Sequence, residues 1–155
     1  MRATLLWRGT HAAIAHIGDT RAYLLRDGEL TQLTRDHTLG QLLIDEGLIQ
    51  PEELGSDFRH SLIVGCLDGE TDVPADITGH EAAARDRYLL CTSIDRFRPP
   101  RPAREILQEI LTDERDPQDA ADRIAATAFP ALQYGGTCIV ADVVERPSEH
   151  GRTLG

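Results

Sequence analysis

Lysine is absent from this sequence of 155 residues, so all 16 basic side chains are arginine. This absence excludes Schiff-base catalysis and the phosphate-binding loops that depend on a lysine. Long apolar runs are absent too. No segment approaches the roughly 20 residues of a membrane span, and the apolar stretch after Met1 is too short for a signal peptide. We therefore expect a soluble, cytoplasmic protein.

Cysteine is scarce, and the three residues Cys66, Cys91 and Cys138 lie far apart without a C-x-x-C pair. Their mostly apolar surroundings in the sequence indicate buried, reduced thiols. A zinc site built from them and the six histidines would require ligand spacings that the chain lacks. The sequence therefore predicts no disulfide framework, no zinc and no other resident cofactor.

Positive charge is in deficit, because 26 acidic against 16 basic side chains give a formal net charge of -10. Such a charge repels phosphate backbones and anionic lipids, so neither nucleic acid nor membrane is expected as a partner. The length suits one domain, whose folding would hide roughly 70% of the surface of the unfolded chain. No repeat or linker divides the sequence. We expect one domain over residues 1–145 and a polar tail over 146–155.

Short β-like segments separated by turn signals fill the first 33 residues and predict a β-meander. Asp27-Gly28 has the residue types of a two-residue hairpin loop, because glycine tolerates the positive φ that such loops require. Adjacent apolar residues within 11–17 predict a strand that is buried on both faces. The expected strands cover residues 3–8, 11–17, 21–26 and 29–33.

Helix signals begin at Thr38, which opens a capping-box pattern ahead of a helix over 39–47. Pro51 indicates one short helical turn. Further helices are expected to start at Pro102 and Asp116, with apolar faces suited to packing on a sheet. The other strand candidates are the weaker segments 61–67 and 71–77, the strongly apolar segment 87–92, and a last strand over 137–144.

Residues 14–28, which contain the run Gly18-Asp19-Thr20-Arg21, resemble the Gly-Asp-Ser-Arg strand pair of the metal-dependent type 2C serine/threonine protein phosphatases, especially the bacterial ones. Further motifs follow in family order and at family spacing, over residues 32–38, 49–53, 67–69 and 86–91. Several motifs in the right order, covering roughly residues 3–144, are stronger evidence than one short pattern. The resemblance implies an α+β fold. The expected architecture is an αββα sandwich of two mixed sheets flanked by helices, with two divalent cations at one end.

The family, as the resemblance implies, uses two Mn²⁺ or Mg²⁺ ions held by aspartates and a glycine carbonyl, and the ions share a water that attacks phosphorus. This sequence departs from that pattern three times. The family's Asp-Gly pair precedes the strand near Ala3 and is missing, which predicts a domain incomplete at its amino-terminal side. Ser93 stands where a Ser-Asp-Gly motif has its metal aspartate. Tyr134 and Gly135 stand where the family has Asp-Asn before the last strand.

Asp19 is the family metal carboxylate that remains, and it matches a third, weaker metal position of bacterial members. We treat it as a residual metal candidate, although a turn-forming role is favoured because a lone carboxylate binds a hard cation weakly. Asp95 could replace Ser93 only if the strand end were rearranged, since successive strand residues point to opposite faces. No catalytic residue is assigned.

Four other features that could carry chemistry are interpreted as structural. His37 is expected to fix the turn before the next helix rather than to transfer protons. His16 is expected to be a core or sheet-face histidine rather than a ligand. Ser93 lacks the histidine segment and the glycine-rich elbow of a nucleophile. The proline-rich segment 98–102 is expected to be a stiff loop rather than a polyproline ligand.

The sequence therefore predicts a type 2C phosphatase-like domain without its catalytic centre, acting as a protein-binding or regulatory module. The expected partner is a protein or phosphoprotein recognised by surface shape. The alternative is an active Mn²⁺- or Mg²⁺-dependent phosphatase, with a metal site rebuilt from Asp19, Asp36 and Asp95 or completed by another chain. A third interpretation is that Met1 is not the true start or that the gene is decaying, in which case unpaired sheet edges would favour self-association.

Overall fold

Two antiparallel sheets stacked on each other form the body of the computed structural model, which describes residues 1–54, 57–66, 73–93, 101–132 and 135–145. The smaller sheet has the order β1-β2-β5, and the larger sheet has the order β4-β3-β6-β7. Their bounds are β1 Arg2–Arg8, β2 His11–Ile17, β3 Arg21–Arg26, β4 Glu29–Gln32, β5 Asp76–Glu81, β6 Arg87–Cys91 and β7 Cys138–Asp142.

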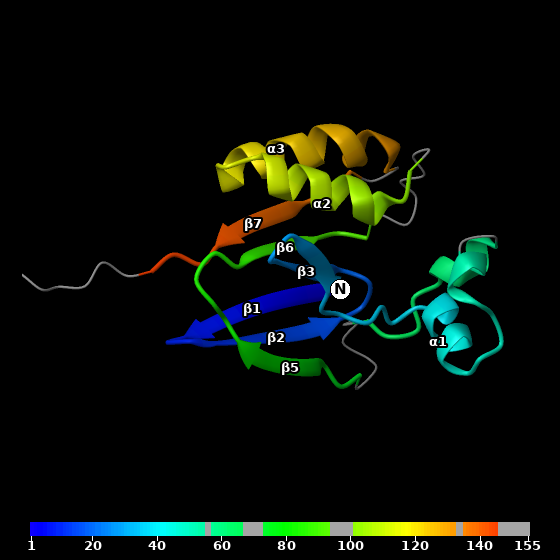
Figure 1. Ribbon diagram of the computed structural model, residues 1–155. Coiled ribbons are helices and arrows are strands. Elements are labelled where there is room, and N and C mark those ends of the chain that lie inside the picture. Colours follow the sequence, from blue (N-terminus) through cyan, green and yellow to red (C-terminus); the bar gives the residue numbers. More distant parts are fainter. Residues whose placement is uncertain (55–56, 67–72, 94–100, 133–134, 146–155) are drawn as a thin grey trace, which may run out of the picture.

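Helices cover the larger sheet on the side away from the smaller one (Figure 1). These helices are α2 Ala103–Asp113 and α3 Pro117–Ala128, followed by the 3₁₀ turn η3 Phe129–Ala131. The remaining helical pieces, α1 Leu39–Asp45 with the 3₁₀ turns η1 Pro51–Glu53 and η2 Phe58–Ser61, lie beside the sandwich. The predicted α+β sandwich is confirmed. In the described residues, however, all strand pairs are antiparallel, so the expected mixed sheets are not found there.

The predicted hairpin between β3 and β4 is confirmed. Arg26 and Glu29 are paired, so Asp27 and Gly28 form a two-residue loop. Both loop residues have positive φ, 52° for Asp27 and 81° for Gly28. This is the backbone that matches the right-handed twist of the strands in a tight hairpin, and it explains why glycine occupies the second position.

The main core lies between the larger sheet and the helices. Burial on both faces occurs in the larger sheet, where Tyr23 faces the helices and its neighbour Leu24 packs toward the smaller sheet. The buried residues of the main cluster are Tyr23, Leu30, Leu89, Cys91, Leu107, Ile110, Leu111, Ala120, Ile124 and Ala128. A smaller cluster around Tyr88 joins the two sheets, and the ring of Trp7 meets the Tyr88 ring edge-on at 5.1 Å.

Burial on both faces was wrongly expected for β2. Ala12, Ile14 and His16 are buried against the larger sheet, but the alternate residues Ala13 and Ala15 are only half-buried. The reason is that no helix among the described residues covers the outer face of the smaller sheet, in contrast to the larger one.

Two strand predictions in the middle of the chain need correction. Residues 61–66 form no strand beyond an isolated bridge between Thr38 and Ile63, because η2 occupies the start of this segment. The strand expected over 71–77 begins only at Asp76, where pairing with β2 starts at His16. Residues 67–72 lie outside the described part of the chain.

The helix starts follow their capping residues. The Thr38 side chain accepts a hydrogen bond from the Gln41 backbone N–H, and the Asp116 side chain accepts one from the Gln118 N–H at 2.7 Å. The predicted helix over 39–47 ends at Asp45, with Gly47 at φ 69° beyond it. No helix among the described residues is long and apolar enough to cross a membrane.

Candidate functional site

Three chain segments of the phosphatase resemblance meet at one end of the sandwich. The turn of Gly18 and Asp19 joins β2 to β3, and Arg21 at the start of β3 pairs with Cys91 at the end of β6. Thr92 then exchanges hydrogen bonds with Thr137, which precedes β7: the Thr92 N–H donates to the Thr137 carbonyl at 3.0 Å, and the Thr137 N–H donates to the Thr92 hydroxyl at 3.2 Å. Asp19, Ser93 and Gly135 therefore lie in segments that converge at this end of the sandwich.

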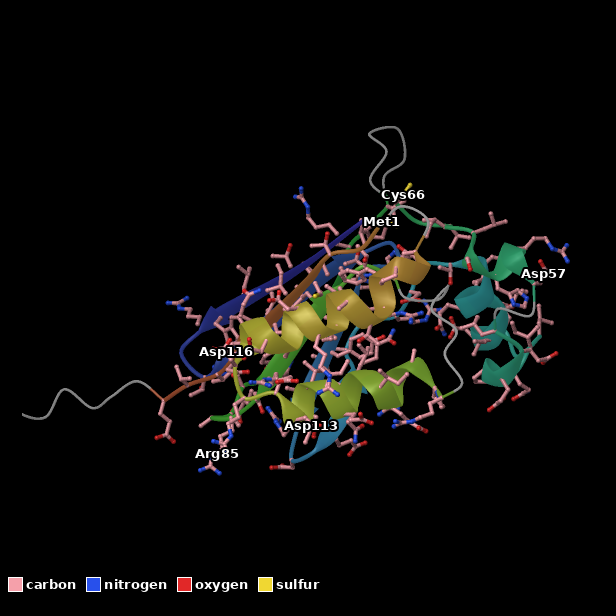
Figure 2. All side chains as sticks on the ribbon, turned by 90° about the horizontal axis from the view of Figure 1, so that it is seen from above. Met1, Asp57, Cys66, Arg85, Asp113 and Asp116 are labelled. Atoms are coloured by element: carbon pink, nitrogen blue, oxygen red, sulfur yellow. The ribbon has the colours of Figure 1, made fainter. Side chains whose placement is uncertain are left out.

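This end of the molecule is the one at which Met1 lies, because a side chain added to Gly18 would meet Met1 atoms at 2.5 Å. Figure 2 shows Met1 and Cys66 toward one end, and Arg85, Asp113 and Asp116 toward the other.

The residues that converge do not fit a pair of Mn²⁺ or Mg²⁺ ions. Asp19 contributes one carboxylate, Ser93 contributes a hydroxyl, and Gly135 has no side chain. Asp95 and Tyr134 lie outside the described residues. Two hard cations require several oxygen ligands, most of them charged. The donor set of the described residues is too small, and no catalytic step through two metals follows from it.

Asp36, the second carboxylate of the rebuilt metal site considered above, is already occupied. Its two oxygens accept hydrogen bonds from Arg21, with both distances from Nε at 3.0 Å and a further close contact from Nη2. The side chain is buried, so this ion pair is shielded from water. Removing Arg21 from Asp36 would leave an uncompensated buried charge, which is strongly unfavourable. Asp36 is therefore a structural partner of Arg21, which argues against its use as a substitute ligand in the alternative of a rebuilt metal site.

A different group of ligand atoms gathers just inside the same end. The pairing of β2 with β5 sets His16 directly opposite Asp76, and His37 reaches them from the loop after β4. His37 Nε2 lies 3.0 Å from Asp76 Oδ2, and the rings of His16 and His37 meet edge to face with 5.0 Å between centroids. One ligand atom from each of the three residues lies within 4.8 Å of the others.

The backbone holds His37 firmly in this group. The His37 N–H donates to the Gly18 carbonyl at 2.8 Å, and the Gly18 N–H donates back to His37 Nδ1 at 3.3 Å. His37 thus fixes the turn before Thr38, as the sequence predicted. Because Nδ1 accepts from the Gly18 N–H, Nε2 is the ring nitrogen that donates to Asp76.

His16 is the unusual member, because it is only 2% exposed and neither ring nitrogen makes a hydrogen bond of ordinary geometry. Burial and the neighbouring His37 lower the pKa of His16 below its ordinary value, against the opposing effects of Asp36, Asp76 and the Thr20 backbone. The imidazole is therefore neutral at pH 7. A buried polar group left without a partner destabilises a fold by about 1–3 kcal/mol.

The sequence prediction for His16 was correct about burial but missed this group. Ligand spacing reveals a zinc site only where the ligands lie close together in the sequence. These three ligands come instead from β2, the β4–α1 loop and the start of β5. Alternation in β2 places His16 on the inward face, but only the register with β5 reveals Asp76 beside it. The proline-rich segment 98–102 lies mostly outside the described residues.

Comparison with known proteins identifies the relatives of this chain. No protein-family model matches the sequence. It is 42% identical over 153 residues to the serine/threonine protein phosphatase PstP of Mycobacterium tuberculosis, which covers 96% of this chain and 28% of PstP. It is 32% identical over 127 residues to the serine/threonine phosphatase Stp of Listeria monocytogenes, covering 82% of this chain and 48% of Stp.

Solved structures of PstP are also similar to the structure of this chain. A crystal structure of M. tuberculosis PstP superposes with a TM-score of 0.81 at 40% identity, covering 92% of this chain and 59% of that one. A second PstP structure, of the catalytic domain in complex with two manganese ions, gives a TM-score of 0.74. The chain thus spans between about a quarter and three fifths of the length of these relatives. It belongs to the bacterial type 2C family of serine/threonine protein phosphatases.

Proposed function

We propose that this chain is a type 2C phosphatase domain without paired-metal catalysis, which serves as a protein-binding or regulatory module in the cytoplasm. The observation that carries the proposal is the donor set at the end of the sandwich. Ser93 stands where the family motif has a metal aspartate, and Asp19 is the family metal carboxylate that remains. A serine hydroxyl at this position supplies no negative charge to hold a hard cation.

A protein-binding role is supported by the outer face of the smaller sheet. The strand register places Leu6, Ala13 and Gly79 in one row across this face, with Thr4, Ala15 and Ile77 in the next row. Leu6 is 64% exposed and Ile77 is 75% exposed. Exposed apolar side chains in neighbouring rows of an uncovered sheet face are typical of surfaces that bind another protein. The same surface, or the edge strand β1, would also serve self-association.

The test is phosphate release from a phosphothreonine peptide with and without millimolar Mn²⁺, with M. tuberculosis PstP as the active reference. We expect no metal-dependent release above background from this chain. Ser93→Asp is the matched variant, because it restores one family carboxylate beside Asp19. It should also remain inactive, since two carboxylates are still too few for two ions.

Metal-dependent turnover by the wild-type chain would contradict the proposal. If Asp19→Asn then abolished that turnover, the active alternative would apply, with a site formed by Asp19 and Asp95 or completed by another chain. Asp36 would not belong to such a site, because Arg21 holds both of its oxygens.

A further inference from the structure

The geometry points to a second kind of metal site in this molecule: we propose that His16, His37 and Asp76 bind one divalent transition-metal ion of the zinc type. Two imidazoles and one carboxylate are one of the donor sets that zinc takes in proteins when three side chains hold the ion and a water completes the tetrahedron. Their ligand atoms already lie within 4.8 Å of one another. A metal at the centre of such a triangle would need only short movements of each side chain.

His16 provides the first independent support. Its ring is buried between the sheets, and neither nitrogen makes a hydrogen bond of ordinary geometry, so the Thr20 backbone interacts with it only weakly. Buried side-chain nitrogens are nearly always hydrogen-bonded, and one of the two His16 nitrogens lies within 4.8 Å of ligand atoms of His37 and Asp76, so a metal ion would supply that nitrogen with a partner.

The second support is an entry path. A cavity of about 460 Å³ opens onto both His16 and Asp76, and the Asp76 side chain is half exposed. An ion could therefore reach His16 from solvent past Asp76 and keep a water in the remaining position. Arg35 also lines this cavity, but its charge is compensated by an ion pair with Asp45.

The third support is the local charge. Asp76 is a ligand, and the nearby Asp36 carboxylate also acts electrostatically on His16. Both lower the energy of a cation in this position. The Arg21 guanidinium paired with Asp36 weakens that second contribution, which makes Asp76 the main source of negative charge.

Metal binding changes one existing contact. The Nε2 proton of His37, now shared with Asp76, must move to Nδ1 when Nε2 coordinates the ion. The Gly18 N–H then loses its acceptor at Nδ1, a contact that is already long at 3.3 Å. The 2.8 Å bond from the His37 N–H to the Gly18 carbonyl does not involve the ring and is retained.

This site is distinct in chemistry from a pair of Mn²⁺ or Mg²⁺ ions. Imidazole nitrogen favours zinc, cobalt and nickel, whereas magnesium and manganese favour carboxylate, carbonyl and water oxygens. The inference is also independent of whether the chain hydrolyses phosphate. Either result of the phosphatase assay leaves the zinc-type site to be tested by its own measurement.

The experiment is a titration of the untagged chain with Co²⁺, followed by the visible absorption of tetrahedral cobalt, and then with Zn²⁺ in competition. We expect one Co²⁺ per chain with tetrahedral absorption that Zn²⁺ displaces. His16→Asn should weaken binding by about 100-fold or more, since even loss of an outer partner of a ligand weakens metal affinity about 10- to 100-fold.

Asp76→Asn gives a second variant, because Asp76 is half exposed and the change should leave the fold intact. It should also weaken binding, whereas the matched control Asp113→Asn, at an exposed carboxylate on α2, should not. Circular dichroism of each variant without metal establishes that it is folded. Absence of a stoichiometric Co²⁺ signal, or equal affinity in the wild-type, His16→Asn and Asp76→Asn chains, would overturn the proposal.

Discussion

The Arg87 side chain connects strand β6 to strand β7 and to the end of helix α2. From β6 it donates to both carboxylate oxygens of Asp142 on β7, at 2.6 and 2.7 Å. It also donates to carbonyls at the end of α2, those of Leu111 at 2.8 Å and Arg115 at 2.9 Å, with a further contact to Glu114. The hydrogen bonds to Asp142 raise the pKa of Arg87, so the side chain stays charged.

Replacing Arg87 with methionine should therefore destabilise the fold strongly. Methionine keeps much of the volume but leaves Asp142 and the carbonyls at the end of α2 without their donor. We expect a loss of about 3 kcal/mol in the free energy of unfolding, as for other broken buried pairs. Urea denaturation measures it. Arg101→Gln is the control, since its ion pairs with residues of α2 are exposed and contribute little to stability. Equal effects of the two substitutions would refute the role of Arg87.

Tyr23 and Cys91 predict how stability responds to alkaline pH. Burial raises the pKa of Tyr23 to about 12 and that of Cys91 to about 12, from ordinary values of 10.0 and 9.0. Both groups are neutral when protonated, and the unfolded chain releases their protons at lower pH than the folded one. Their contribution is thus fully present below about pH 9 and is lost as pH rises toward 12.

Tyr23→Phe should reduce the loss of folding stability at the upper end of this pH range. With the hydroxyl removed, the loss of stability between pH 10 and 12 should be smaller by up to about 3 kcal/mol, because each pKa unit corresponds to about 1.4 kcal/mol. Urea midpoints at a series of pH values measure the difference. If the urea midpoints of wild type and variant fell equally with pH, the pKa of Tyr23 would be the same in the folded and the unfolded chain.

At the scale of elements, the hairpin of β3 and β4 requires a positive φ at Gly28 but no tight packing around that residue. Gly28 has φ 81°, yet a Cβ added there would meet no atom within 4 Å. Gly28→Ala should thus cost about 1 kcal/mol through backbone strain alone. Gly79→Ala is the matched control, because Gly79 has ordinary strand φ and a Cβ there would make only a 3.7 Å contact. It should change unfolding free energy by less than about 0.5 kcal/mol, and a similar loss in both variants would contradict this explanation.

Elements with strong local signals were predictable from the sequence, and those held by distant pairing were not. The Asp27-Gly28 loop, the Thr38 and Asp116 caps and β6 follow from their own residue types. The start of β5 at Asp76 depends instead on its register with β2, which no local pattern contains. The Asp19 and Ser93 positions came from the resemblance, whereas the grouping of His16 with Asp76 required the register itself.

At the scale of the whole molecule, the two faces of the sandwich differ. Helices α2 and α3 cover the larger sheet, while no described helix covers the smaller one (Figure 1). The double variant Leu6→Gln, Ile77→Gln should bind less of an apolar dye such as anilinonaphthalene sulfonate and should keep its stability within about 0.5 kcal/mol, since both residues are exposed. Leu48→Gln, at an exposed leucine after α1, is the control and should leave dye binding unchanged. Undiminished dye binding by the double variant would show that this face is not the exposed apolar surface.

The most direct test of the central claim, a type 2C fold without a paired-metal centre, is a calorimetric titration of the folded chain with Mn²⁺, with PstP as reference. The donor set of Asp19 and Ser93 predicts no tight binding of two ions. Two Mn²⁺ ions bound per chain at micromolar concentration, with affinity lost in Asp19→Asn, would contradict the claim. The alternative of an active phosphatase would then apply.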